Sequence, residues 1–230
     1  MRLIKALKSD LRFQYKHGFY AVYTFITVLY IIIMQKIPSG LLKDYAVALI
    51  VFSDPAMLGF FFIGGIIMLE KQQGIIDYLA VTPLSPQEYI KAKVVTLGLL
   101  SIVASILASI LITLTTHLNG VNWLILFVAI ALVSVFFTLY GFLVASGCHT
   151  INQYFLRMIP FLILTILPCF AVIGFPYSWI FNVFPNVAGL KLTIGAFLGI
   201  SWQDAVFYLM VICVWDWVVY AVALRVYDRN

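Results

Sequence analysis

The sequence has very few charged residues for its length. Only 10% of its 230 residues are charged and 64% are apolar, whereas roughly a quarter of a typical globular chain is charged. A soluble fold of this size could not cover its surface with so few charges. The apolar runs are long and unbroken, which excludes an outer-membrane barrel, because barrel strands read as short alternating segments. The composition therefore predicts an all-α integral membrane protein.

The sequence also lacks the motifs of common catalytic sites. No glycine is followed by lysine, so the chain has no G-x-x-x-x-G-K-[ST] loop to cradle the phosphates of ATP. The hydrolase motifs H-E-x-x-H and G-x-S-x-G are absent as well. The three cysteines lie far from one another, as do the three histidines, without metal-ligand spacing: Cys148, Cys169, Cys213, His17, His117 and His149. We therefore expect no catalytic residues, no metal site, no bound cofactor and no enzymatic activity.

Six apolar runs are long enough to cross a membrane as helices, which takes about 20 residues each. They cover residues 18–34, 45–69, 94–115, 123–147, 158–175 and 205–224. The first run has a basic flank like that of a signal peptide. No A-x-A cleavage site follows it, so we interpret it as an uncleaved span. The sequence thus predicts a six-span transmembrane domain over residues 18–230.

Two apolar stretches are interrupted. In the second run, either the span is continuous and buries Asp54 near the middle of the bilayer, or Asp54 caps a helix that begins at Pro55, which we favour. The stretch 176–204 is broken by prolines and glycines, and its Tyr177 and Trp179 suit the outer interface. Its irregular backbone has to be buried in protein or line water, or the stretch is a surface loop with an aromatic belt.

The basic residues set the orientation. Six spans place both termini on the same side of the membrane. If that side is the cytoplasm, 11 of the 14 Lys and Arg residues lie inside, and Lys36, Lys43 and Lys191 lie outside, in accord with the positive-inside rule. The net charge of +5 does not indicate nucleic-acid binding, because these residues punctuate apolar runs and form no patch. We therefore expect a cell-membrane protein with both termini in the cytoplasm.

Residues 1–17 predict an amphipathic helix. At 100° per residue, one face is apolar and another is basic. The two faces comprise Leu3, Ile4, Leu7, Leu11 and Tyr15 on the apolar side and Arg2, Lys5, Lys8, Arg12 and Lys16 on the basic side. We expect this helix to lie in the cytoplasmic interface, where each basic side chain near anionic lipid is worth about 1 kcal/mol. The alternative is a simple positive-inside flank.

The most informative segment is the loop 70–93, which the orientation places in the cytoplasm. Gly74 is predicted to end the second span. A short apolar surface follows that cannot all face lipid: Ile75, Ile76, Tyr78 and Leu79. Aliphatic side chains exposed at the membrane surface suit insertion into a partner's groove. The alternative is an amphipathic loop packed on its own bundle.

The second half of the loop carries a helix-start signal. Pro83 ends the first piece. Ser85 is a good N-cap, Pro86 suits the first helical position, and Glu88 lies where it can close a capping box. We therefore interpret the loop as two short helices.

These residues resemble the permease subunits of type-2 ABC transporters. That family has an acidic–basic pair at the end of span two, a Gly-Thr-Leu-Glu-like turn, then Thr-Pro-Leu-Ser, an acidic residue and a lysine leading into span three. The matching residues are Glu70, Lys71, Gly74, Leu79, Thr82, Pro83, Leu84, Ser85, Glu88 and Lys93. The departures are Ile75 and Ile76 for Thr-Leu and Asp77 for Glu. Within the family, the chain is most similar to drug- and peptide-export permeases, including those labelled fluoroquinolone exporters.

The resemblance implies a transport subunit. Two permeases, identical or related, would form the translocation path, and separate ATPase subunits would bind ATP and Mg²⁺ below them. The loop would be a coupling helix that contacts the ATPase. Its coupling residues would be Glu70, Lys71, Gly74, Ile75, Ile76, Asp77, Leu79, Thr82 and Pro83. The stretch 176–204 would form a pair of short re-entrant helices near the outer gate, and the substrate would be a drug, a peptide or a lipid-like amphiphile.

An acidic residue, Asp216, lies twelve residues into the last run. An acid at that depth costs at least about 2.5 kcal/mol, so it either faces protein or water, or its carboxyl lies nearer the interface. We expect Asp216, together with Asp54, to line the path or to pair helices.

Other functions stay open at this point. A haem-export permease of cytochrome c maturation shares six spans and a similar length. A membrane enzyme, a secondary transporter and a structural membrane protein are further alternatives. The missing phosphate loop agrees with a permease that is driven by a separate ATPase.

Overall fold

The chain folds into a bundle of helices. A computed structural model describes residues 2–38, 40–75, 85–116, 120–169 and 178–227, and no strand occurs within these ranges. The α-helices and the π-helix η1 follow one another as α1 (Arg2–Lys16), α2 (Phe19–Lys36), α3 (Leu41–Met57), η1 (Leu58–Phe62), α4 (Ile63–Gln72), α6 (Pro86–Thr116), α7 (Trp123–Ser146), α8 (Ile151–Ile166), α9 (Ser178–Phe181), α10 (Pro185–Leu198) and α11 (Trp202–Tyr227).

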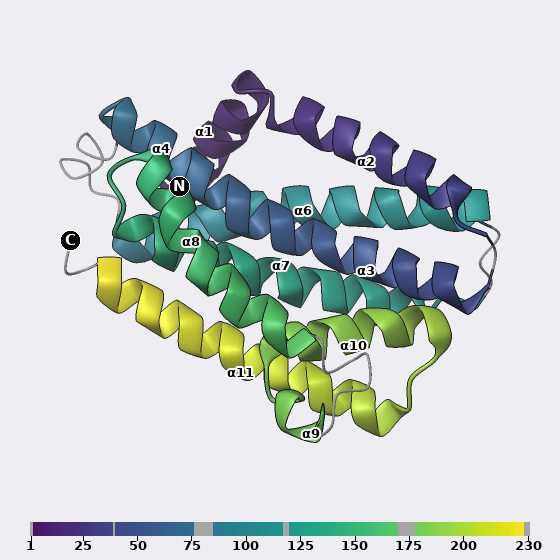
Figure 1. The fold of residues 1–230 in the computed structure, drawn as a ribbon. Coiled ribbons are helices and arrows are strands. Elements are labelled where there is room, and N and C mark those ends of the chain that lie inside the picture. Colours follow the sequence, from purple (N-terminus) through teal and green to yellow (C-terminus); the bar gives the residue numbers. More distant parts are fainter. Residues whose placement is uncertain (1, 39, 76–84, 117–119, 170–177, 228–230) are drawn as a thin grey trace.

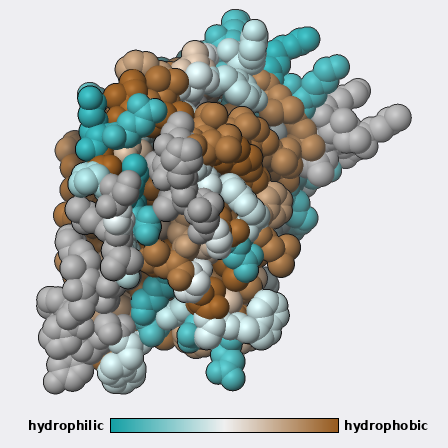
Figure 2. Space-filling model, turned by 90° about the vertical axis from the view of Figure 1, so that its right-hand side faces the viewer, coloured by the Kyte–Doolittle hydropathy of each residue, from teal (hydrophilic) through white to brown (hydrophobic). Residues whose placement is uncertain are grey.

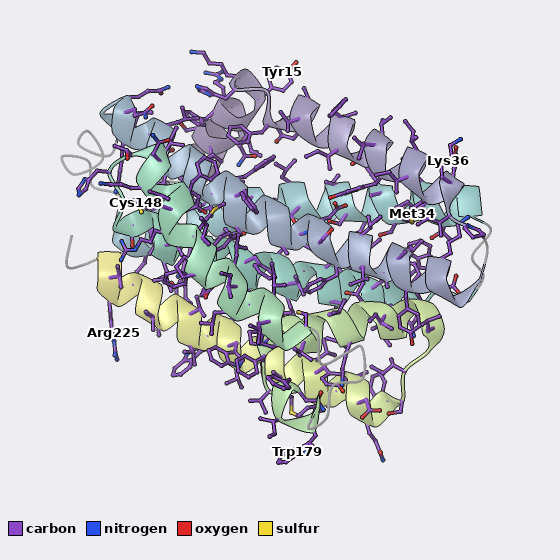
Figure 3. The ribbon with its side chains drawn as sticks, viewed as in Figure 1. Tyr15, Met34, Lys36, Cys148, Trp179 and Arg225 are labelled. Carbon is purple, nitrogen blue, oxygen red and sulfur yellow. The ribbon has the colours of Figure 1, made fainter. Side chains whose placement is uncertain are left out.

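The long helices run side by side, so the bundle has two ends (Figure 1). One end holds α1, the end of α4, the start of α8 and the end of α11, and we call it the terminal end. The opposite end, the far end, holds the α2–α3 connection and the turn from α10 to α11. Lys36 extends from the far end and Arg225 from the terminal end (Figure 3).

Six helical segments are long and apolar enough to cross a membrane, which confirms the predicted six-span fold. They are Phe19–Lys36, Lys43–Gln72, Gln87–Leu114, Trp123–Ser146, Ile151–Cys169 and Trp202–Val226. The fifth segment begins earlier than the predicted 158. Thr150 caps α8 by accepting a hydrogen bond from the Gln153 N–H at 3.3 Å, and the polar residues of the first turn hide this start from a search for apolar runs.

The second span is one helical stretch with a π turn inside it, so the predicted cap at Asp54 is wrong. Asp54 and Pro55 both lie within α3, and the π-helix η1 begins only at Leu58. Proline removes a backbone hydrogen bond from a helix, and a membrane helix tolerates this when neighbouring helices satisfy the displaced groups. Further along the same span, the Tyr154 hydroxyl of α8 donates to the Phe60 carbonyl within η1.

The stretch before the last span contains two short helices, α9 and α10, as expected. Most of α10 is buried, and it packs against α3, α7 and α11. The Asn186 amide of α10 donates to the Thr165 carbonyl of α8, and the Ala196 carbonyl accepts from the Asn122 N–H at 2.8 Å. The helix α10 is therefore enclosed by protein, whereas α9 and the turn at Gly199 are exposed. The Trp179 side chain points away from the bundle (Figure 3).

The outer surfaces are mostly apolar along the bundle. Large apolar side chains such as Phe25 on α2, Leu164 on α8 and Val214 on α11 are exposed, as expected of helices that face lipid tails. Figure 2 looks onto the far end, where hydrophilic side chains lie among the apolar ones.

The first helix has the predicted length, but its bundle-facing side was not predicted. Leu11 and Tyr15, which belong to the predicted apolar face, are exposed, Tyr15 by 79%. Asp10 and Gln14 turn towards the bundle instead, and Gln14 is fully buried. The helix α1 therefore presents polar side chains to α6 and an apolar edge outward. This arrangement fits a helix whose apolar edge lies in the lipid interface.

Candidate functional site

The loop between α4 and α6 leaves the bundle at the terminal end, and glycine ends α4 as predicted. The Gln73 N–H bonds the Leu69 carbonyl at 3.0 Å, and the Gly74 N–H bonds the Lys71 carbonyl at 3.1 Å. Gly74 has a φ of +67°, a left-handed conformation that glycine adopts without strain at the end of a helix. The chain therefore turns sharply away from α4 at this residue.

The other side of the loop begins with the predicted capping box. The Ser85 N–H donates to Glu88 Oε2 at 2.9 Å, and the Glu88 N–H donates to Ser85 Oγ at 3.2 Å. The predicted short second helix is wrong, however, because α6 continues without a break from Pro86 to Thr116. No glycine or proline separates Pro86 from the apolar run that follows, so the cap starts the third span itself.

Side chains from three helices meet beside these two stems, and we call them the Lys93 cluster: Asp10 of α1, Glu70 of α4, and Tyr89 and Lys93 of α6. Lys93 Nζ lies 2.6 Å from Asp10 Oδ1 and also bonds Glu70 Oε1. The Tyr89 hydroxyl donates to Glu70 Oε2 at 2.8 Å. Lys93 is only 1% exposed and Glu70 only 4%. The cluster therefore joins both stems of the loop to α1.

The Lys93 cluster holds two acids and one base. Burial raises the pKa of the Asp10 carboxyl above its ordinary value, and the Lys93 ammonium opposes this rise only in part. Each buried carboxylate relies on the same ammonium, so removal of that ammonium would leave two uncompensated charges. Lys93 is thus the central residue of the connection.

Lys71 makes a second connection from the end of α4. Its Nζ donates to the Ser146 carbonyl at 3.1 Å and to the Cys148 carbonyl at 2.6 Å. These carbonyls lie at the C-terminal end of α7, where the helix leaves its last acceptors unpaired and where a cation complements the helix dipole. The end of α4 is thereby attached to the turn between α7 and α8.

The structure brings four of the nine predicted coupling residues together. Glu70, Lys71, Gly74 and Ile75 are consecutive or nearly so at the end of α4. The other five lie outside the described residues, and their coupling role stays a prediction: Ile76, Asp77, Leu79, Thr82 and Pro83.

The sequence analysis missed Asp10 and Tyr89 as members of the site. For Asp10 the sequence does hold a signal, because it is the one acidic residue among the first 43. A single acidic residue on a basic helix indicates a specific ion-pair partner and not a contribution to solubility. Tyr89 carries no such signal, since an aromatic residue at the start of a span reads as an interfacial anchor.

The two acids within the spans lie outside the Lys93 cluster. Asp54 is buried in α3, thirteen residues and therefore about 20 Å from the start of that helix. Asp216 lies in α11, and both of its carboxylate oxygens are buried without a hydrogen-bond partner among the described residues. Their role in the path or in helix pairing stays a prediction.

The site offers electrostatic connections rather than reactive groups. Within the described parts of the chain, no three His, Cys, Asp or Glu side chains gather as a possible metal site. Cys148 is buried and its Sγ contacts the Val144 carbonyl at 3.2 Å. The arrangement can hold helices in fixed relative positions and can pass a displacement of the loop to α1, α6 and α7.

Comparison with known proteins identifies the family. The family model described as fluoroquinolones export permease protein matches residues 1–230. The fluoroquinolones export permease proteins of Mycobacterium tuberculosis strains CDC 1551 and H37Rv are each 27% identical to this chain over 206 residues, which is 88% of this chain and 85% of each relative. Six membrane-length helices agree with a multi-pass permease. The resemblance seen in the loop is therefore confirmed, and the chain belongs to the fluoroquinolones export permease protein family.

Proposed function

We propose that this chain is the permease subunit of an ABC exporter, which forms the translocation path as a dimer and is driven by separate ATPase subunits. The family match and the coupling-loop residues support this proposal. ATP and Mg²⁺ bind to the partner, because this chain has no phosphate-binding loop.

The observation that carries the proposal is the double attachment of the loop between α4 and α6. The Lys93 cluster ties one stem to α1 and α6, and Lys71 ties the same stem to the end of α7. Such attachments suit a lever, because an ATPase that moves the loop would move α1, α6 and α7 with it. A loop without a mechanical role would need no buried ion pairs, since these add little net stability.

The proposed orientation places the terminal end in the cytoplasm. The three basic residues expected outside fit this arrangement: Lys36 and Lys43 flank the α2–α3 connection, and Lys191 lies in α10. A cysteine placed at Gln87, which is exposed next to the capping box, should react with a membrane-impermeant reagent only from the cytoplasm. A cysteine at Asn119 should react only from outside, and labelling of Gln87 from outside would overturn the orientation.

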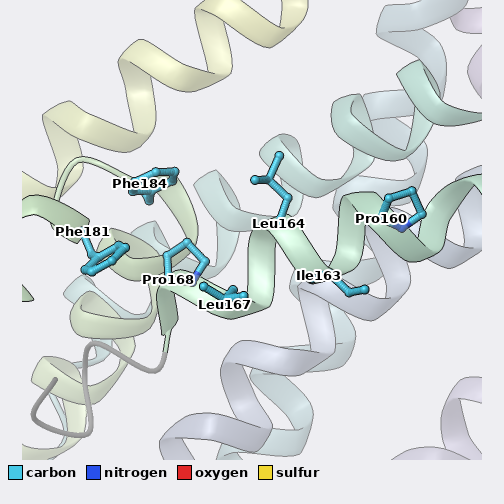
Figure 4. Close-up of a pocket in the computed structure, with 7 residues that line it drawn as sticks. All are labelled: Pro160, Ile163, Leu164, Leu167, Pro168, Phe181 and Phe184. Atoms are coloured by element: carbon cyan, nitrogen blue, oxygen red, sulfur yellow. The ribbon is translucent and has the colours of Figure 1, made fainter.

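A second permease copy, identical or related, would complete the path. The helices α2, α8 and α11 are the spans least covered by the rest of the chain. On α8, an apolar hollow of about 390 Å³ opens between Ile163 and Leu167 on one side and Phe181 and Phe184 on the other (Figure 4). A partner helix that fills this hollow would gain close van der Waals packing, which drives helix association in membranes. A disulfide between copies at an introduced Ile163→Cys, in a chain without native cysteines, would test this interface.

The substrate is proposed to be a drug, a peptide or a lipid-like amphiphile. The printed names of the two relatives assign them fluoroquinolones, and this class of drug is the first to test. Affinity purification of the chain in mild detergent should co-purify an ABC ATPase, and a fluoroquinolone should stimulate ATP hydrolysis by that complex. Purification of the chain without any ATPase would contradict the proposed function.

A further inference from the structure

The outward side of α1 combines basic and apolar side chains. Lys8, Arg12 and Lys16 are exposed on it, and Leu11 and Tyr15 beside them are 40% and 79% exposed. At about 100° per residue, these five side chains lie within an arc of about 140°, with the apolar pair at one edge and the cations along the rest. Tyr15 extends from the outer edge of the bundle (Figure 3). We call this surface the outer face of α1.

The cations of the outer face have no carboxylate partner within the described parts of the chain. The ion pairs found there both belong to Lys93, so none involves Lys8, Arg12 or Lys16. Exposed cations beside exposed apolar side chains are typical of a helix that lies in a membrane interface. In that position the apolar edge enters the lipid, and the cations meet negatively charged headgroups. The charge of the outer face therefore favours anionic lipid.

The inner face of α1 buries little apolar surface over residues 7–16, where its side chains are described. Gln14 is the one buried residue in this range. Its amide oxygen and nitrogen both lack a hydrogen-bond partner among the described residues, which makes its burial unfavourable. Phe13 packs on the core only in part, and the ion pair from Asp10 to Lys93 is the strongest polar contact. Contacts of the outer face therefore help to determine how firmly α1 stays docked.

The position of α1 bears on both stems of the loop between α4 and α6. Asp10 Oδ1 lies 2.6 Å from Lys93 Nζ of α6, and the same ammonium bonds Glu70 at the end of α4. Just beyond the C-terminal end of α1, His17 Nε2 lies 3.5 Å from the Gln73 amide nitrogen, one residue before the glycine that ends α4. A shift of α1 would therefore disturb contacts at each stem.

We propose that the outer face of α1 binds anionic phospholipid headgroups, and that this binding keeps Asp10 against Lys93 at the stems of the loop. Anionic lipid would then stabilise the loop in its present position, and uncharged lipid would loosen it. The inference rests on the proposed function only in placing this face at the cytoplasmic leaflet and in naming the loop as the coupling element. The lipid contact and its effect on the stems need no ATPase.

Hydrogen–deuterium exchange of the permease in lipid nanodiscs measures both parts of the proposal. Discs of phosphatidylcholine are compared with discs that also contain phosphatidylglycerol, in peptides from α1, from both stems and from the far end. We expect phosphatidylglycerol to slow exchange in α1 at least tenfold, because each basic residue near an anionic surface shifts an equilibrium by about fivefold. Exchange at the stems should slow as well, and exchange in the turn from α10 to α11 should not change. Salt at about 1 M, where the Debye length is about 3 Å, should abolish both effects.

A variant and a matched control assign the lipid contact to the outer face. The variant neutralises the three cations of this face: Lys8→Gln, Arg12→Gln and Lys16→Gln. The control neutralises three exposed cations on other helices: Lys36→Gln, Lys91→Gln and Arg225→Gln. The outer-face variant should lose the slowing by phosphatidylglycerol in α1 and at the stems, whereas the control should retain it.

Two substitutions in the Lys93 cluster test the transmission to the stems. Asp10→Asn removes the charge that pairs with Lys93 but leaves the outer face intact. Exchange in α1 should therefore still slow in phosphatidylglycerol, while exchange at the stems should no longer respond. Glu70→Gln leaves the pair between Asp10 and Lys93 in place, so the start of α6 should respond as in the unaltered protein.

The proposal is overturned if α1 exchanges equally fast in both lipids, or if the matched control loses the effect as fully as the outer-face variant. It is also overturned if the stems of Asp10→Asn still respond to phosphatidylglycerol. Protection of α1 by an added ATPase, and not by phosphatidylglycerol, would assign the outer face to that protein instead of lipid. The salt dependence decides the matter if the outer-face variant does not insert. Each of these results leaves ATPase co-purification by the unaltered chain, and so the proposed function, untouched.

Discussion

Replacement of the buried Lys93 by methionine should destabilise the protein far more than replacement of an exposed lysine such as Lys8. The side chain is 1% exposed and its ammonium contacts both Asp10 and Glu70. Lys93→Met leaves two buried carboxylates without a cation, and breaking a buried ion pair from one side costs roughly 3–5 kcal/mol. For a chain of this size, each kcal/mol shifts the unfolding midpoint by about 2–4 °C, so we expect a fall of roughly 6–20 °C.

The assay is heating in detergent followed by size-exclusion chromatography of the remaining folded protein. Lys8→Met removes the same charge from an exposed position on α1 and should shift the midpoint by less than about 2 °C, as surface substitutions do. Glu70→Gln should be much milder than Lys93→Met, because Lys93 keeps Asp10 and the amide oxygen still accepts from Tyr89. Adding Asp10→Asn and Glu70→Gln to Lys93→Met should restore most of the lost stability. A midpoint of Lys93→Met equal to that of Lys8→Met would refute the central role of this ammonium.

Three further substitutions probe other parts of the molecule. Burial raises the pKa of Asp10, so its favourable contribution is fully present below its ordinary pKa and is lost as pH rises through the folded value; Asp10→Asn should remove this fall from thermal unfolding curves recorded from about pH 4 upward, and an unchanged slope would contradict the assignment. Gly64→Ala places a methyl group against the Tyr154 ring, whereas Gly65→Ala meets open space; the first should cost about 1–3 kcal/mol by overpacking and the second should not, and equal unfolding midpoints would disprove the close contact. Asp216→Asn should reduce substrate-stimulated ATP hydrolysis more than ATPase co-purification. Normal hydrolysis and transport by this variant would mean that the Asp216 carboxyl lies near the membrane interface and has no role in the path.

Much of the fold follows from local sequence, because a segment that crosses the lipid bilayer has few possible backbone structures. A span needs about 20 apolar residues with all backbone groups bonded internally, so the six runs in the sequence become the six membrane-length helices. The capping box at Ser85 and the glycine at position 74 form as predicted, since both depend on residues within one turn. Errors arose where tertiary contacts override a local signal. The Asp54-Pro55 pair resembles a helix start, but α3 continues through it to Met57.

For each contact of the candidate site, the sequence predicted one of the two partners but not the other. The sequence indicates that Glu70 and Lys71 matter as a pair at the end of a span. It does not indicate that Glu70 meets Lys93, which also binds Asp10, or that Lys71 reaches the carbonyls at the end of α7, 75 and 77 positions away. Such contacts depend on how α1, α6 and α7 pack around α4, and a single sequence carries no direct record of that packing.

The coupling role of the loop between α4 and α6 is tested most directly by charge substitution at Ile76 and Leu79. Both residues belong to the aliphatic surface predicted to enter the ATPase, and burial of each aliphatic side chain is worth roughly 1.5–3 kcal/mol. The double variant Ile76→Asp/Leu79→Asp would forfeit this contribution and place charges in an apolar groove. The measurement is pull-down of the ATPase by the tagged permease, together with substrate-stimulated ATP hydrolysis, and membrane insertion of the variant serves as the control. We predict that the variant inserts normally but loses both the bound ATPase and the stimulated hydrolysis, whereas retention of both at the level of the unaltered protein would contradict the assignment of this loop as the coupling element.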